Sequence, residues 1–179
     1  MLSILPMTLL LLGLCVAVFI YDMLFLRVPN RLLLLALTAQ AAALLLTGRG
    51  IGGIDATQSL IGGVTGLFLF VPLYALRAMG AGDVKFFAVL GLLLGPGYMV
   101  PLWLIGSLLA GLHAVALYLS RRGMIVLPLG LQQLVRRIAD SAAYRRLLSG
   151  RQGRQGIPYA AYLAVAAVAT TGYGDLQMH

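Results

Sequence analysis

Six apolar stretches follow one another along this chain of 179 residues and account for most of its length. Hydrophobic residues make up 61% of the sequence and charged residues only 10%, whereas charged residues usually make up about a quarter of a soluble domain. Apolar runs of about 20 residues are typical of helices that cross a bilayer. The sequence therefore predicts an all-α fold, a polytopic membrane protein built as a six-transmembrane-helix bundle. We expect the helices over residues 2–21, 31–47, 57–76, 84–99, 101–119 and 157–173.

Local signals support these boundaries. The first stretch lacks a basic start and a small-residue cleavage site, so we expect it to be retained as a helix. Gly95-Pro96-Gly97 and Pro101 interrupt the helical pattern and separate the short fourth stretch from the fifth. Small residues four apart in membrane helices permit close helix packing. Such pairs are Gly62 and Gly66, Gly91 and Gly95, and Gly106 and Ala110.

Basic residues are distributed unevenly over the predicted connections. Six crossings place twelve of the thirteen lysines and arginines at the face of the first, third and fifth connections, and only Arg49 at the other. Because cytoplasmic loops are enriched in basic residues, we expect that face to be cytoplasmic and both termini to lie outside. In a membrane protein, a net charge of +8 is explained by basic residues in the cytoplasmic loops. We therefore expect no nucleic-acid partner.

The fifth connection, residues 120–156, is the only long polar segment and contains eight arginines but one acid, Asp140. Apolar residues recur in it at helical spacing and predict a basic amphipathic helix, a type that binds anionic membrane lipid. They are Leu131, Leu134, Val135, Ile138 and Ala142. We interpret it as a solvated, topology-setting cytoplasmic loop of a single membrane-embedded domain, residues 1–179. The alternative is that this loop binds the substrate directly.

All five acids of the chain are aspartates, and the predicted topology separates them. Asp22 ends the first helix and Asp83 begins the fourth at the same cytoplasmic face. Asp55 and Asp175 are expected outside, and Asp140 lies in the basic loop. Asp22 and Asp83 are therefore the two carboxylates that can meet at one membrane face, where an ionisable group is a functional candidate.

Two carboxylates can hydrolyse a peptide without a metal or cofactor. One takes a proton from water while its protonated partner donates a hydrogen bond to the carbonyl under attack. This chemistry suits a chain with two histidines and one cysteine, Cys15. Since Asp83 opens a helix and Asp22 closes one, the helix dipoles favour Asp83 as the anion and Asp22 as the proton carrier.

The turn from Met79 to Lys85 surrounds Asp83 with glycines. Gly80 and Gly82 can adopt positive φ or permit close backbone approach of an extended substrate. Alternatively, they only form a tight turn between helices. Lys85 lies nearby, without an assigned chemical role.

Three short motifs occur in order along the chain. They are Asp22 followed by Val28-Pro29-Asn30, then Gly80-Ala81-Gly82-Asp83, and finally Ile157-Pro158-Tyr159-Ala160. They resemble the first aspartate motif, the GxGD signature and the C-terminal element of one family, the type IV prepilin peptidases, which are GxGD intramembrane aspartic proteases. The resemblance spans residue 15 to the chain's end.

The resemblance implies removal of the leader peptide from prepilins or pseudopilins, at the cytoplasmic face of the bacterial inner membrane, with Asp22 and Asp83 catalytic. Pro29, Asn30, Gly80, Gly82, Lys85, Pro158 and Tyr159 match supporting motif positions. Larger members carry paired CxxC motifs and also N-methylate the new terminus. The short first connection here contains no cysteine, so the chain resembles the short peptidase-only type of Flp or tight-adherence pili, and we expect no N-methyltransferase activity.

Two other interpretations are open. Asp22, Asp83 and His113 could form the proton relay of a small membrane transporter, although His113 is predicted to hydrogen-bond between helices. The run Thr170-Thr171-Gly172-Tyr173-Gly174-Asp175 resembles a potassium-channel filter. A filter is followed by an inner helix, and only Leu176 to His179 follow this run, so we interpret it as a helix end.

Overall fold

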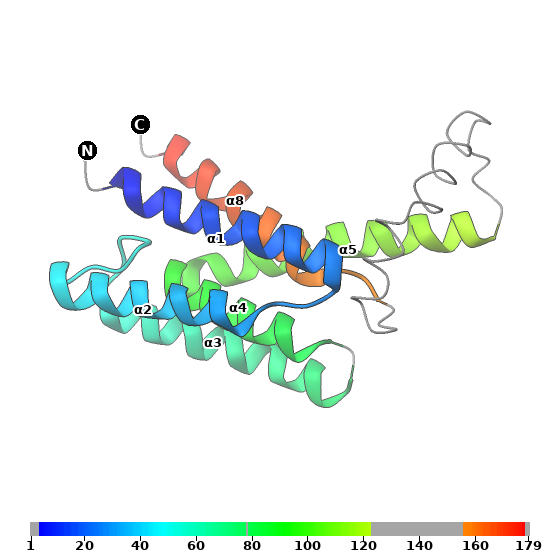
Figure 1. Ribbon diagram of the computed structural model, residues 1–179, viewed down its shortest axis with the longest axis horizontal. Coiled ribbons are helices and arrows are strands. Elements are labelled where there is room, and N and C mark those ends of the chain that lie inside the picture. Colours follow the sequence, from blue (N-terminus) through cyan, green and yellow to red (C-terminus); the bar gives the residue numbers. More distant parts are fainter. Residues whose placement is uncertain (1–3, 78, 123–155, 178–179) are drawn as a thin grey trace.

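The computed structural model describes residues 4–77, 79–122 and 156–177. In these residues the chain forms six α-helices and one short 3-10 helix, η1, which lies between α4 and α5 (Figure 1). The elements are α1 (Ile4–Phe25), α2 (Asn30–Thr47), α3 (Ala56–Ala75), α4 (Ala81–Leu94), η1 (Pro96–Tyr98), α5 (Met99–Arg121) and α8 (Tyr159–Gln177). Each helix corresponds to one of the six predicted stretches, so the all-α prediction is confirmed. The predicted amphipathic helix of the basic loop lies outside the described residues.

Helix length and hydropathy support a membrane location. Three spans are long and apolar enough to cross a bilayer: Asn30–Thr47, Ala56–Ala75 and Pro96–Ser120. Shorter apolar spans occur in α1, over Leu9–Phe25, and in α8, over Tyr159–Gly172. The chain is therefore a helical membrane protein.

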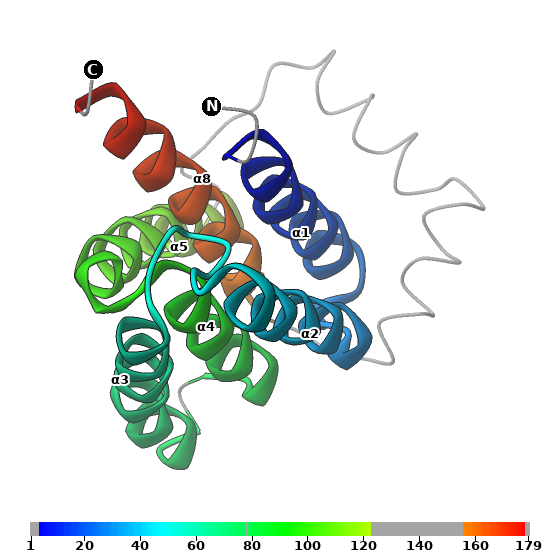
Figure 2. The same cartoon turned by 90° about the vertical axis from the view of Figure 1, so that its left-hand side faces the viewer.

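Helix α4 is shorter than predicted and lies at the centre of the bundle. It ends at Leu94 because Gly95 has φ 84° and Pro96 begins the 3-10 helix. Helix α4 packs against α2, α3 and α8, as Figure 2 shows. A helix that is apolar on all sides is suited to a buried position, and the protein around α4 provides that position.

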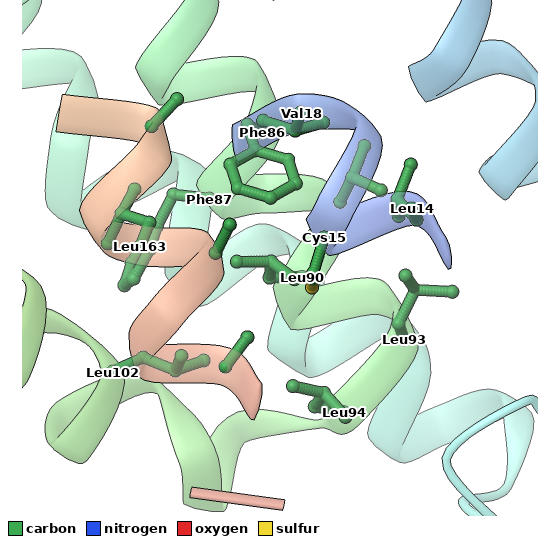
Figure 3. Close-up of a cluster of buried hydrophobic side chains, with 14 of the residues drawn as sticks. Leu14, Cys15, Val18, Phe86, Phe87, Leu90, Leu93, Leu94, Leu102 and Leu163 are labelled. Atoms are coloured by element: carbon green, nitrogen blue, oxygen red, sulfur yellow. The ribbon is translucent and has the colours of Figure 1, made fainter. Parts of the chain in front are cut away.

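The hydrophobic core surrounds α4. Phe86, Phe87, Leu90 and Leu93 are fully buried there (Figure 3). The cluster also contains side chains of α1, α5 and α8, among them Cys15, Val18, Leu102 and Leu163. The core thereby fixes the position of α4 relative to α1 and α8, which carry other parts of the candidate site.

Backbone contact between α3 and α4 depends on glycine. A β-carbon added at Gly62 would overlap the carbonyl oxygen of Gly91, and one at Gly91 would overlap the carbonyl oxygen of Gly62. One turn further along α3, a β-carbon at Gly66 would lie 3.1 Å from the carbonyl oxygen of Phe87. The predicted small-residue packing is confirmed for these glycines.

A buried polar cluster joins α2, α3 and α4. The Gln40 amide donates to the Ser59 hydroxyl at 3.0 Å and to the Leu92 carbonyl at 2.8 Å, and its oxygen accepts from the Ile51 N–H at 2.8 Å. Ser59 also donates to the Leu92 carbonyl, at 2.5 Å. The cluster fixes the end of α4 that lies away from Asp83.

Candidate active site

Three helix ends meet at one end of the bundle: the end of α1, the start of α4 and the start of α8 (Figure 1). A cavity of about 690 Å³ opens there, and both Asp22 and Asp83 line it. The other lining residues are Tyr21, Leu26, Arg27, Val28, Pro29, Asn30, Gly80, Ala81, Gly82, Lys85, Gly156 and Ile157. The structure thus brings the two predicted aspartates to one cavity from positions 61 residues apart in sequence, 83 minus 22.

The start of α8 holds the Asp22 carboxylate. Asp22 lies in the last turn of α1 and is 4% exposed. Its Oδ2 accepts a hydrogen bond from the backbone N–H of Ala161 at 3.0 Å. The unpaired N–H groups at a helix start suit a carboxylate, so the start of α8 binds the Asp22 member of the pair.

This arrangement changes the prediction about division of labour. The prediction that Asp22 carries the proton assumed that its carboxylate faces only the negative end of its own helix. In the structure the carboxylate also faces the positive end of α8. Asp83 likewise lies in the first turn of a helix. The helix ends therefore do not distinguish proton carrier from anion.

Asp83 is fixed by the turn that precedes it. Its Oδ2 accepts the backbone N–H of Gly80 at 3.3 Å, and its own N–H donates to the Gly80 carbonyl at 3.1 Å. The suggestion of positive φ is wrong, because Gly80 has φ −75° and Gly82 lies within α4. Close approach explains Gly80 instead, since a β-carbon there would lie 3.0 Å from Oδ2 of Asp83.

The turn between α1 and α2 forms the opposite wall of the cavity. Leu26 has φ 51° and donates its N–H to the Asp22 carbonyl, which ends α1 one turn after Asp22. Pro29 has φ −69° and ψ 125° and precedes the first residue of α2, Asn30. A β-carbon at Gly82 would contact Val28 at 3.4 Å. The Val-Pro-Asn motif thus packs beside the glycines of the second motif.

Tyr159 connects the site to the core. Its hydroxyl shares a 2.8 Å hydrogen bond with Ser107 of α5, and its ring packs edge-on against Phe70 at a centroid distance of 6.0 Å. Phe70 stacks on Phe87, one turn after Asp83, with ring centroids 4.0 Å apart. Pro158 is buried, directly before α8. These contacts place the start of α8, and hence its N–H donors, against α4 and α5.

The remaining polar candidates have different positions. Lys85 lines the cavity and is exposed. His113 hydrogen-bonds through Nδ1 to the hydroxyl of Tyr162, as predicted for a residue that joins two helices. Within the described residues, His113 does not line the Asp22–Asp83 cavity. That position weakens the transporter alternative, since its relay requires His113 beside the two aspartates.

The other acids lie elsewhere. Asp55 caps the start of α3, where its carboxylate accepts the Gln58 N–H at 2.7 Å. Asp175 belongs to the last part of α8, the helix whose first turn holds Asp22. Asp140 lies outside the described residues. Asp22 and Asp83 are the acids that share a cavity in the part of the chain that the structure describes.

Sequence reasoning missed the backbone contribution of α8. The donor is the N–H group of Ala161, a residue without a functional side chain. The Ile-Pro-Tyr-Ala motif drew attention to this stretch of the chain. A sequence motif identifies side chains, however, and does not show which carboxylate the backbone N–H groups of the stretch will bind. A helix start that directly follows a proline was the available signal.

Comparison with known proteins identifies the family of this chain. The model of the type IV leader peptidase family matches residues 9–115, more than half of the chain, and that range contains both Asp22 and Asp83. The prepilin leader peptidase/N-methyltransferase of Bacillus subtilis (strain 168) is 31% identical over 113 residues, which cover 62% of this chain and 44% of that protein. The chain thus aligns with less than half of that relative's length. No solved structure matches significantly. The chain belongs to the type IV leader peptidase family.

Proposed function

We propose that the chain is an intramembrane aspartic endopeptidase that removes the leader peptide of prepilins or pseudopilins. The observation that carries the proposal is the shared cavity: Asp22 and Asp83 line it together, and a backbone N–H binds each carboxylate. Membership of the leader peptidase family supports the peptidase activity and the class of substrate. The whole chain acts as one membrane-embedded unit.

The reaction is direct attack of water on the scissile carbonyl. One carboxylate of the pair accepts a proton from the attacking water while the other, protonated, donates a hydrogen bond to the carbonyl oxygen. The proton then passes to the leaving amine, so both carboxylates return to their starting states after one hydrolysis. The Ala161 N–H orients the Asp22 carboxylate, and the Gly80 N–H orients that of Asp83.

The cavity wall is suited to an extended peptide. Gly80 and Gly82 line the cavity beside Asp83, and residues without a side chain allow close backbone approach. Pro29, Asn30 and Lys85 lie around the same opening. We assign these residues to substrate positioning rather than to proton transfer.

The type of prepilin and the location of the enzyme are proposed from the sequence. We propose an Flp-type prepilin as substrate and no N-methyltransferase activity, because the first connection is short and contains no cysteine. The distribution of basic residues supports an inner-membrane enzyme with its site at the cytoplasmic face and both termini outside. It also supports contact of the basic segment 120–156 with anionic lipid.

Co-expression with an Flp-type prepilin tests the proposal. A smaller product on a gel and a mass that corresponds to a free, unmethylated amino terminus are expected. An intact prepilin, together with intact type IV pilus and pseudopilin substrates, would contradict peptidase activity and favour the transporter alternative. A product with an added methyl group would contradict only the prediction about methylation.

A further inference from the structure

A second cavity adjoins the candidate active site. It has a volume of about 820 Å³ and shares Gly80, Asp83, Gly156 and Ile157 with the first cavity. Its other lining residues are Leu73, Arg77, Met79, Trp103, Ser107, Ala110, Gly111, Ala114 and Tyr159. Asp83 therefore borders two cavities, one towards α1 and α2 and one towards α3 and α5.

The second cavity is a groove between α3 and α5. Leu73 of α3 lies on one side, and a row of small residues of α5 lies on the other: Ser107, Ala110, Gly111 and Ala114. Their spacing puts them on one face of α5. A β-carbon added at Gly111 would have no other atom within 4 Å, so the groove is open there.

The two cavities differ in chemical character. Arg27, Asn30 and Lys85 line the first, beside Asp22. The second has mainly apolar walls, with Leu73, Met79 and Trp103 among them, and its one lysine or arginine in the described residues is Arg77. A single peptide that passes Asp83 thus has polar surroundings on one side and apolar surroundings on the other.

We propose that the groove between α3 and α5 is the docking surface for an apolar helical segment of the substrate, on one side of the scissile bond. This inference rests on the proposed function. The groove is continuous with Asp83, so a segment docked in it is covalently close to the bond at the carboxylates. Small residues along α5 let a second helix approach closely, which is how helices associate in a bilayer. A soluble peptide without an apolar segment would leave these walls uncovered.

Cysteine cross-linking tests the docking surface directly. The chain has one cysteine, Cys15, which is buried, so the wild-type chain serves as the blank. Gly111→Cys places a thiol in the groove. Gly13→Cys is the matched control, because Gly13 is also an open helical glycine but lines a separate hollow between α1 and α2. Each is combined with Asp83→Asn and a prepilin carrying one cysteine, either in its apolar segment or in its leader.

The expected result is a disulfide between Gly111→Cys and the apolar segment, with none to the leader and none from Gly13→Cys. In enzyme with Asp83 intact, Gly111→Phe should lower cleavage of the prepilin about tenfold, the change that corresponds to one lost contact of about 1.4 kcal/mol. Gly13→Phe should cleave it at the wild-type rate.

The outcomes separate the two proposals. Two results would contradict docking in the groove while leaving the peptidase function intact. In both, the wild type cleaves the prepilin, and either no cross-link forms at position 111 or positions 111 and 13 form equal cross-links. A Gly111→Cys product that contains two copies of this chain also contradicts substrate docking, since the groove is then an interface between copies. Absence of cleavage by the wild type contradicts the proposed function itself.

Discussion

The close contact between α3 and α4 predicts an unusual response to alanine. Glycine to alanine in a helix normally stabilises it by up to about 1 kcal/mol. At Gly62 the new β-carbon would overlap backbone atoms of Gly91 and Gly95, which cannot rotate away as a side chain can. Overpacking costs typically about 1–3 kcal/mol. Gly62→Ala should therefore lower the free energy of unfolding by about 1–2 kcal/mol, despite the better helix propensity.

Two further alanines complete the series. Gly111→Ala meets no atom within 4 Å and should raise the free energy of unfolding by up to about 1 kcal/mol. Gly66→Ala meets the Phe87 carbonyl oxygen at 3.1 Å and should fall between the other two.

The buried thiol of Cys15 provides the assay. It is 1% exposed and is the only cysteine, so a thiol-reactive fluorescent dye reports thermal unfolding of the detergent-solubilised protein and gives its melting temperature. We predict that Gly111→Ala is the most stable of the three variants, Gly66→Ala the next and Gly62→Ala the least stable. If Gly62→Ala were as stable as Gly111→Ala, the reasoning about backbone contact between α3 and α4 would be refuted.

Three other substitutions probe the remaining structure. Gln40→Leu leaves the buried N–H of Ile51 without its acceptor and should cost about 1–3 kcal/mol in the same thermal assay; an unchanged melting temperature would contradict the polar cluster. Arg77→Gly should stabilise the protein by up to about 1 kcal/mol, because Arg77 has φ 58° and the relief of that left-handed backbone exceeds the chain entropy that glycine loses on folding; a lower melting temperature would argue against that backbone conformation. Tyr159→Phe removes the hydrogen bond to Ser107 and should cost about 1 kcal/mol while slowing cleavage through looser placement of α8; a wild-type melting temperature and rate would show that the bond is dispensable.

The helices were predictable because hydrophobic runs and their interruptions are local in sequence. The fourth helix was predicted to end at residue 99, but Gly95 and Pro96 end it at Leu94; the Val-Pro-Asn turn separates α1 from α2 as predicted. The predicted start of the fourth helix, residue 84, was late. Ala81 begins it, because Asp83 accepts the Gly80 N–H and stabilises the first turn.

The aspartates were predictable and their surroundings were not. Few acids and an uneven charge distribution singled out Asp22 and Asp83. The Ala161 N–H that binds Asp22 lies 139 residues away, and no local pattern predicts such a contact. Gln40 was also overlooked, although an amide within an apolar helix is a recognisable signal of hydrogen bonding between helices.

The most direct test of the central claim is prepilin cleavage by Asp22→Asn and Asp83→Asn, with Asp55→Asn as the matched control. Asparagine keeps an oxygen that can accept the Ala161 or Gly80 N–H, so both site variants should stay folded in the Cys15 assay. Asparagine also serves as a helix cap at position 55. We predict a loss of at least about a hundredfold in each site variant, the effect of removing a general acid or base, and wild-type cleavage by Asp55→Asn. Cleavage near the wild-type rate by either folded site variant would contradict the paired-aspartate account.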